Sequence, residues 1–266
     1  MPAPLAALPR VLVTRPQQQA QAMVADLREA GIDALALPLI EIRPVADARP
    51  LQQAWASIGE LSLLMFVSAN AVQAFMAQRP AGYAWPARML AGSTGPGTSA
   101  ALREAGVPAA ALVEPAGADF DSEALWLQLR ARDWAGRRVL VVRGEQGRDW
   151  LAEQLDRAGA TVAFLAAYER HVPCWRAEER ALLGQALGSP ARWLWLFSSS
   201  EAVANLGRLA PGADWSQAAA MASHPRIEAA ARRLGFGRVS LGPLSPAAVH
   251  QQLRPGATRS IQSDTS

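Results

Sequence analysis

Several hydroxyl and amide side chains of this 266-residue chain stand at the start of predicted helices. The free N–H groups and the positive dipole end of a helix N-terminus can hold carboxylates. Ser, Thr and Asn are also the usual N-cap residues, so capping alone explains the same pattern. The pattern therefore predicts anion binding, capping or both at five residues: Ser68, Asn70, Thr98, Ser199 and Ser200.

Three arginines add positive charge near the same turns. Arg15 and Arg143 follow equivalent apolar runs, and Arg148 opens the helix after the second run. A guanidinium pairs bidentately with a carboxylate, so these side chains suit a polyanionic ligand. An ion pair with a neighbouring acid is the alternative for each arginine, and it is the preferred interpretation of Arg148.

The elements that must position these residues alternate between short apolar runs and stretches of helical period. Such alternation predicts an α/β fold, with parallel sheets covered by helices on both faces. Ligands of open α/β sheets gather at the carboxyl ends of strands, where these polar residues stand. Strands are predicted at 11–14, 63–67, 88–90, 111–113, 139–142, 194–197, 218–221 and 238–241, and helices at 17–30, 69–78, 97–105, 119–131, 147–158, 201–208, 225–234 and 245–253.

The chain contains an internal repeat. VLVTRPQQQAQAMVADLREAG at 11–31 returns as VLVVRGEQGRDWLAEQLDRAG at 139–159. FVSANAVQAF returns as FSSSEAVANL, and GPGTSAALREAG as HPRIEAAARRLG, in the same order and at nearly the same spacing. A period this long indicates duplicated domains and not a solenoid. We therefore expect two similar α/β modules.

A long, mostly apolar segment follows the first helix of each copy. These segments, at 33–44 and 161–173, are longer than an ordinary strand and end in charged residues. Two equivalent strands of this kind can pair and bridge the modules. Periodicity leaves two independent buried strands as an equal alternative.

Composition argues against several classes of protein. All 26 basic residues are arginine, which excludes a Walker P-loop and lysine Schiff-base chemistry. The net charge is only +3 and the arginines are dispersed among acids, so no nucleic-acid partner is expected. One cysteine, Cys174, and three scattered histidines predict neither a disulfide nor a metal site.

Three sequence patterns are absent: a membrane span, a secretory signal and a dinucleotide-binding motif. No apolar run approaches the roughly 18 residues of a membrane span, and the N-terminus lacks a secretory pattern, so we expect a cytoplasmic protein. The run GSTGPG at 92–97 lacks the G-x-G-x-x-G order, and no acid follows at the spacing of a ribose contact. A dinucleotide cofactor is therefore not expected.

Nine strings resemble the bacterial uroporphyrinogen-III synthases. They are VLVTRP, LPLIEI, FVSANAV, GPGTSAALREAG, VLVVRG, GRDWL, AYER, FSSSEAV and SHPRIEAAA, and they lie in one order between Val11 and Leu253. The resemblance implies two α/β modules joined by a two-stranded antiparallel linker, with a cleft between them. It places 1–36 with 173–256 in domain 1, 46–160 in domain 2, linker strands at 37–45 and 161–172, and a flexible tail at 257–266.

The activity that the resemblance implies needs no cofactor. Hydroxymethylbilane, a linear tetrapyrrole with an acetate and a propionate on every ring, loses water to an azafulvene. The substituted α-carbon of the last ring attacks it, and a spiro-pyrrolenine then leads to a macrocycle with that ring inverted. Uncatalysed closure gives the symmetrical type I isomer, so the protein must hold the bilane with the spiro carbon nearest. Nothing in the sequence demands a partner subunit, so we expect a monomer, and transient contact with hydroxymethylbilane synthase stays open.

The resemblance also implies a proton donor. A tyrosine at the position of Tyr168 faces the cleft in the family and is the candidate to assist departure of the hydroxyl group. A phenol with a pKa near 10 stays protonated at neutral pH and can donate to a leaving oxygen. A packed ring whose hydroxyl is satisfied locally is the alternative for a tyrosine in an apolar strand.

The second glycine-rich turn departs from the first. It reads HPRI at 224–227, so Ile227 stands where Thr98 stands in the first copy. A hydroxyl contact is lost there, and His224 is the residue that can replace it with an imidazole. An exposed histidine at a helix start is the alternative.

A different class shares these features. A cytoplasmic two-domain protein that closes on a small anion, without chemistry, also needs a hinge, a cleft and serine-rich helix starts. Conversion of hydroxymethylbilane separates this binding protein from the synthase.

Overall fold

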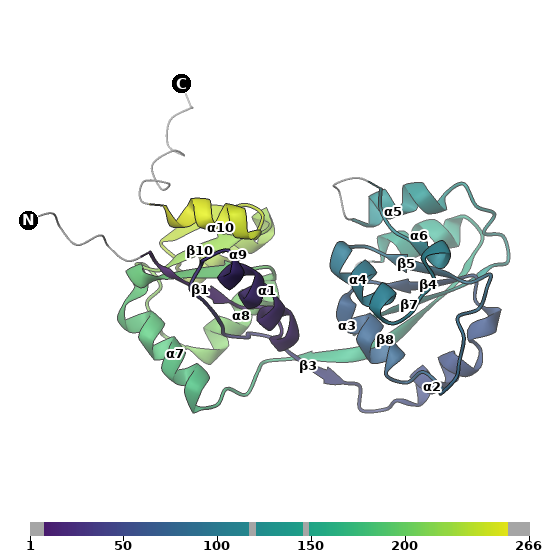
Figure 1. Ribbon diagram of the computed structural model, residues 1–266, viewed down its shortest axis with the longest axis horizontal. Helices are drawn as coiled ribbons and strands as arrows, with labels where there is room; N and C mark the ends of the chain where they lie inside the picture. Colours follow the sequence, from purple (N-terminus) through teal and green to yellow (C-terminus); the bar gives the residue numbers. More distant parts are fainter. Residues whose placement is uncertain (1–7, 117–120, 146–148, 255–266) are drawn as a thin grey trace, which may run out of the picture. The chain divides into compact units, whose positions relative to one another are not determined.

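The computed structural model describes residues 8–116, 121–145 and 149–254. These residues divide into two compact units, each with its own sheet and helices (Figure 1). The described residues up to Glu41 and from His171 onward form unit 1, and Ile42–Arg170 form unit 2. Unit 1 thus combines residues from both ends of the chain. Arg148 lies outside the described residues.

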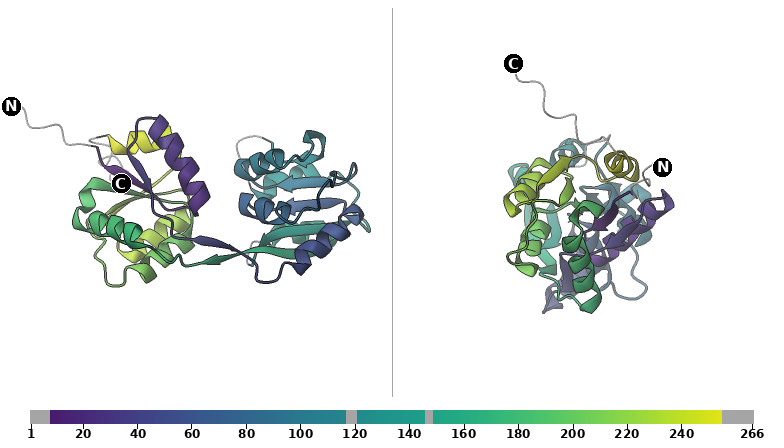
Figure 2. Two further views of the ribbon diagram at one scale, coloured as in Figure 1. Left: turned by 60° about the horizontal axis from the view of Figure 1, so that its bottom comes forward. Right: turned by 90° about the vertical axis from the view of Figure 1, so that its left-hand side faces the viewer.

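Unit 1 contains a five-stranded parallel sheet with the order β11-β10-β9-β1-β2. Strands and helices alternate along the chain, and helices cover both faces of the sheet (Figure 2). Strands buried on both faces read as continuous apolar runs, such as WLWLF at β9. The strands are β1 (Arg10–Val13), β2 (Ala34–Ala36), β9 (Trp193–Phe197), β10 (Ala219–Ala222) and β11 (Arg238–Leu241).

The two faces of this sheet have different cores. Val11 and Val13 of β1 pack with α1 (Gln17–Glu29) and α10 (Pro246–Leu253). An aromatic cluster formed by Trp195, Phe197, Trp215 and Phe236 includes stacked and edge-on ring pairs. The remaining helices of the unit are α7 (Ala177–Gly188), α8 (Ser200–Leu209) and α9 (Pro225–Leu234), with a 3₁₀ turn at Pro190–Arg192.

Unit 2 contains a six-stranded sheet with the order β3-β8-β7-β4-β5-β6. Alternate residues of β4 and β7 face opposite sides: Leu64 and Val142 join the core under α2, α3 and α4, whereas Met65 and Val141 join the core under α5 and α6. The strands are β3 (Glu41–Pro44), β4 (Leu63–Phe66), β5 (Leu90–Ser93), β6 (Leu112–Val113), β7 (Arg138–Gly144) and β8 (Thr161–His171). The helices are α2 (Arg49–Ala56), α3 (Ala69–Met76), α4 (Pro96–Glu104), α5 (Ser122–Leu129) and α6 (Trp150–Arg157), with 3₁₀ turns at Ile58–Glu60 and Ala109–Ala111.

The chain crosses between the units through β3 and returns through β8. The two strands are neighbours in the six-stranded sheet, and their arrows point in opposite directions (Figure 2). The prediction of a paired linker is therefore confirmed. β8 is a single strand of 11 residues, which agrees with the length predicted for the second segment.

The prediction of one long strand over residues 33–44 is wrong. β2 ends at Ala36 and β3 begins at Glu41, and Pro38 between them has no N–H with which to continue a ladder. The carbonyl oxygen of Pro38 accepts from Trp175 Nε1 at 2.9 Å, and that of Leu39 accepts from Asn205 Nδ2 at 2.8 Å. These contacts hold the intervening residues to unit 1 and end the first strand.

Candidate functional site

A β-bulge on β8 positions Tyr168. Arg143 of β7 is opposite Ala166, but Gly144 is opposite Tyr168, so β8 carries one extra residue, Ala167. Ala167 and Tyr168 are consecutive and both buried, at 1% and 4% exposure, whereas a regular strand would turn them to opposite faces. The bulge thus directs Tyr168 to the face covered by α2, α3 and α4.

Ser68 links Tyr168 to the start of α3. Its Oγ lies 3.1 Å from the Tyr168 hydroxyl, and it also accepts from the Ala71 N–H at 3.2 Å as the N-cap of the helix. A serine hydroxyl has one donor and two acceptor positions, so both contacts are made at once. Capping and contact with the candidate proton donor are therefore combined in one side chain.

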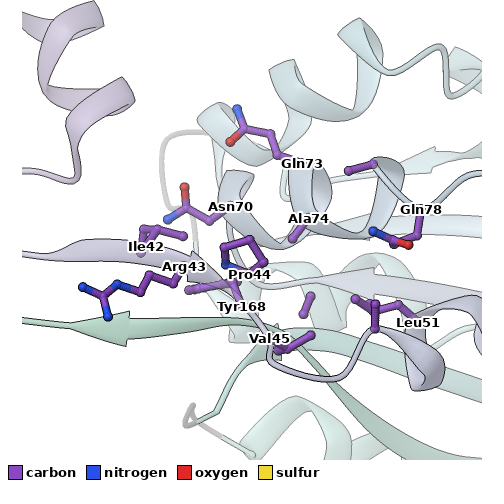
Figure 3. Close-up of a pocket in the computed structure, with 13 residues that line it drawn as sticks. Ile42, Arg43, Pro44, Val45, Leu51, Asn70, Gln73, Ala74, Gln78 and Tyr168 are labelled. Carbon is purple, nitrogen blue, oxygen red and sulfur yellow. The ribbon is translucent and has the colours of Figure 1, made fainter.

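A cavity of about 320 Å³ lies beside Tyr168 in unit 2. Figure 3 shows Asn70 at the start of α3 above Tyr168 and Pro44, while the guanidinium of Arg43 points away from the other labelled residues. Aliphatic side chains form most of the wall, and three amides add hydrogen-bonding groups. The amides are Asn70, Gln73 and Gln78, and the other lining residues are Ile42, Arg43, Pro44, Val45, Ala48, Leu51, Ala74, Ala77, Ala167 and Tyr168.

Thr98 lies in the first turn of α4, and hydrogen bonds between serines stabilise the turn that leads into this helix. Ser99 Oγ donates to Ser93 Oγ at 3.0 Å, and Ser93 Oγ donates to the carbonyl of Gly95 at 2.9 Å. Thr98 itself is 6% exposed and is not among the residues that line the cavity. Its burial favours a packing role in the glycine-rich turn.

Arg143 lies on the opposite face of the sheet from Tyr168. It is two residues from Val141, whose side chain packs under α5 and α6. Its guanidinium forms an ion pair with Asp149 and lies 4.1 Å from the centre of the Phe164 ring. The structure therefore does not bring Arg143 together with Tyr168 and Ser68, and it supports the ion-pair alternative.

Arg15 follows β1 at the carboxyl edge of the sheet of unit 1. Its Nε is buried, and among the described residues no hydrogen-bond partner reaches that atom. Burial lowers the pKa of Arg15, because desolvation penalises the charged form. Arginine nevertheless stays protonated in proteins, so a charged group with an unused donor is present at this edge.

Two serines follow β9, the strand beside β1. Ser200 Oγ is also buried without a hydrogen-bond partner in the described chain, and Ser199, the N-cap residue of α8, makes no side-chain cap bond. Thr14 ties the two strand ends together, because its Oγ1 donates to the carbonyl of Leu196 at 2.6 Å. The edge thus presents polar groups with unused hydrogen-bonding capacity.

His224 follows β10 and caps α9. Its Nδ1 accepts from the Arg226 N–H at 3.2 Å, and Ile227 in the next turn is 5% exposed. The imidazole therefore caps α9 through Nδ1, which leaves Nε2 as the ring nitrogen that can bind a ligand.

The described residues offer no cluster of three His, Cys, Asp or Glu side chains that could hold a metal ion. None of the helices between Leu8 and Arg254 that the structure describes is long and apolar enough to cross a membrane.

Of the residues that line the cavity, sequence reasoning named only Asn70 and Tyr168. Gln73 and Gln78 line the cavity with Asn70, and Gly144 lies beneath the Tyr168 ring. Gln73 lies three positions after Asn70, which is a same-face spacing on a helix and a signal that the sequence contains. Nothing in the sequence indicates the contact of Gly144.

Comparisons with known proteins agree on one family. The model of the family described as uroporphyrinogen-III synthase HemD matches residues 21–243. The chain is 31% identical to the uroporphyrinogen-III synthase of Synechococcus elongatus over 238 residues, which cover 88% of this chain and 82% of that protein. It is also 31% identical to the Escherichia coli uroporphyrinogen-III synthase over 177 residues, or 66% and 71% of the two chains.

Solved structures share the fold. A mutant uroporphyrinogen-III synthase of Thermus thermophilus superposes with a TM-score of 0.54 at 20% identity, over 92% of this chain and 98% of that one. The Helicobacter pylori enzyme superposes with a TM-score of 0.59 at 13% identity, over 93% and 100%. Both matches support the arrangement of two parallel-dominated sheets with their helices.

Replacement of Ser68 tests its double contact. Ser68→Ala removes the α3 cap and the partner of Tyr168, whereas Asp121→Ala removes only the cap of α5, which accepts from the Ala124 N–H at 2.7 Å. We expect each change to lower the free energy of unfolding by roughly 0.5–2 kcal/mol, measured by denaturant titration.

Only Ser68→Ala should also shift the NMR signals of Tyr168. The chain has two tyrosines, Tyr83 and Tyr168, so selective tyrosine labelling separates them. Unchanged Tyr168 signals in folded Ser68→Ala would contradict the contact.

Proposed function

Because the chain belongs to the uroporphyrinogen-III synthase family, we propose that it converts hydroxymethylbilane to uroporphyrinogen III in haem biosynthesis. The substrate loses one water, and a new carbon–carbon bond closes the macrocycle with the last ring inverted. Neither an oxidant nor a reductant is consumed. The reaction can therefore be run by positioned side chains and backbone groups alone.

Tyr168 assists the first step. The C–O bond of the hydroxymethyl group breaks and its oxygen leaves as water, while the pyrrole nitrogen loses a proton as the azafulvene forms. A phenol is protonated at neutral pH and can donate to the departing oxygen. The observation that carries this role is the buried Tyr168 hydroxyl beside the cavity, oriented by Ser68 at 3.1 Å.

The cavity beside Tyr168 receives one ring of the bilane. Its volume of about 320 Å³ is at the small end of ligand pockets, too small for four linked rings. Aliphatic walls suit the face of a pyrrole. The amides of Asn70, Gln73 and Gln78 can bond to its N–H or to its acid arms.

Unit 1 binds carboxylates of the same substrate. Arg15 supplies a charged donor, and Ser199 and Ser200 supply hydroxyl groups at the N-terminus of α8. The buried Arg15 Nε and Ser200 Oγ have unused hydrogen-bonding capacity, and such groups cost free energy unless a ligand or water satisfies them. Each of these groups can donate to an acetate or propionate oxygen that reaches it.

We also propose a setting for the reaction. The protein acts as a monomer in the cytoplasm, and hydroxymethylbilane synthase supplies its substrate. The short lifetime of the bilane favours a transient contact between the two enzymes.

Product analysis tests the proposed activity. Purified protein is mixed with freshly generated hydroxymethylbilane, the products are oxidised, and the uroporphyrin isomers are separated. The proposal requires excess type III isomer formed faster than spontaneous closure. Type I isomer alone, at the rate without protein, would reject the synthase, and substrate binding without conversion would favour a binding protein.

Tyr168→Phe should slow turnover without abolishing it. The azafulvene also forms spontaneously, because the pyrrole nitrogen donates electrons. The loss in kcat should therefore be below roughly 100-fold, which is the lower end of what general acid catalysis contributes. Type III product should stay detectable. Tyr83→Phe is the matched control, because Tyr83 is half-buried against Trp55 and does not line the cavity. Complete loss of activity in folded Tyr168→Phe, or an unchanged kcat, would contradict the role of Tyr168.

Arg15→Ala should weaken substrate binding. Loss of a charge-assisted hydrogen bond to a carboxylate predicts a KM about 10- to 100-fold higher, with a smaller change in kcat. Arg15→Lys keeps the charge but loses the planar fork, so its KM should lie between those of Arg15→Ala and the unmodified protein. Arg157→Ala, which removes an exposed arginine paired with Glu153 in α6, is the control. Equal KM values for all four proteins would exclude Arg15 from the binding site.

A further inference from the structure

Gly144, the last residue of β7, lies directly beneath the ring of Tyr168. A Cβ atom built on Gly144 would be 3.1 Å from Cζ, 3.2 Å from Cε2 and 3.3 Å from the hydroxyl oxygen of Tyr168. These are the atoms that carry the proposed donor. These distances are shorter than about nine in ten Cβ contacts in proteins, so a side chain at this position requires the phenol to move by a few tenths of an ångström.

The backbone does not require glycine at this position. Gly144 is not among the positive-φ glycines of the described chain, which include Gly31 and Gly159. Alanine can therefore adopt the same conformation without strain. The need for glycine comes from the aromatic ring and not from the turn.

The bulge and the glycine act together on one ring. The extra residue, Ala167, turns Tyr168 towards α3, and the missing side chain of Gly144 lets the ring settle against β7. Ser68 Oγ, at 3.1 Å, makes a hydrogen bond with the hydroxyl. The hydroxyl is therefore held by the contact of its ring with Gly144 and by one hydrogen bond.

We propose that Gly144 is a positioning residue that sets the place of the Tyr168 hydroxyl relative to Ser68 and to the leaving oxygen of the substrate. The proposal rests on the proposed role of Tyr168. Gly144 makes no contact with substrate in this scheme and acts only through the ring.

Gly144→Ala tests the proposal. Because displacement by a full ångström can cost roughly 100-fold in rate, a shift of a few tenths should lower kcat about 3- to 10-fold, with KM unchanged. The NMR signals of Tyr168 should move and those of Tyr83 should not. Gly207→Ala is the matched control, since its Cβ would lie 3.0 Å from Leu234 Cδ1 in unit 1, and it should leave kcat and both tyrosines unchanged.

A double-mutant cycle tests whether Gly144→Ala lowers kcat through the Tyr168 hydroxyl. In a Tyr168→Phe background, Gly144→Ala should change kcat by less than twofold, because the hydroxyl that it displaces is gone. An equal loss of kcat in both backgrounds would overturn the proposal, as would an unchanged kcat in a Gly144→Ala protein whose Tyr168 signals have moved. If Tyr168→Phe alone leaves kcat unchanged while Gly144→Ala still moves the Tyr168 signals, the contact stands and the proposed function of Tyr168 fails.

A second variant keeps the proposal testable if the Gly144→Ala protein does not fold. Should Gly144→Ala not fold, Gly144→Ala combined with Tyr168→Leu is compared with Tyr168→Leu alone by circular dichroism. Folding of the double variant supports the clash with the ring as the cause. Failure of the double variant, with Tyr168→Leu folded, would show that the chain itself needs Gly144 and would overturn the proposal.

Discussion

Parallel strand pairing is the constraint on which the candidate site depends. In each sheet the paired strands end at the same edge, so the turns that follow them lie together although the chain visits them far apart. The turns that carry Arg15 and Ser200 follow the paired strands β1 and β9 in this way, and Ser68 follows β4 beside the end of β7. Short polar turns are then sufficient to bring several hydrogen-bond donors to one edge of the sheet. Helix N-termini at the same edge add oriented N–H groups.

The two copies of the repeat use equivalent arginines differently. Arg15 has a buried Nε without a partner, whereas Arg143 is neutralised by Asp149 and stacked on Phe164. The first copy has Gln21 at the position of Asp149, so no acid is available to Arg15 at that point. Of this equivalent pair of arginines, Arg15 is therefore the one whose guanidinium keeps an unused donor for an anion. Symmetric carboxylate binding by the two units is therefore not expected.

The fold was more predictable than the site because apolar runs and helix starts are local signals. VLVV and LWLF predict buried parallel strands, and Ser68 predicts the cap of α3 that the structure contains. Pro38 is a local signal for the break between β2 and β3, but the contacts that hold the break depend on Trp175, 137 residues away, and on Asn205. The bulge at Ala167 and the contact of Gly144 also depend on tertiary register, which no local pattern encodes. Tyr168 was selected through family resemblance alone.

On the proposed mechanism, the protein assists the loss of water modestly, and its larger energetic task is selection between two closures. The bilane also loses water and closes without help, so the protein must favour the type III closure over the spontaneous one. A preference of about 100-fold corresponds to roughly 2.7 kcal/mol, which is the size of one or two charge-assisted hydrogen bonds. Arg15 and the N-terminus of α8 can supply that much by restricting where the acid arms lie. A site built from ordinary arginine, serine and tyrosine side chains is therefore adequate. The place in which these side chains hold the rings of the bilane decides which isomer forms.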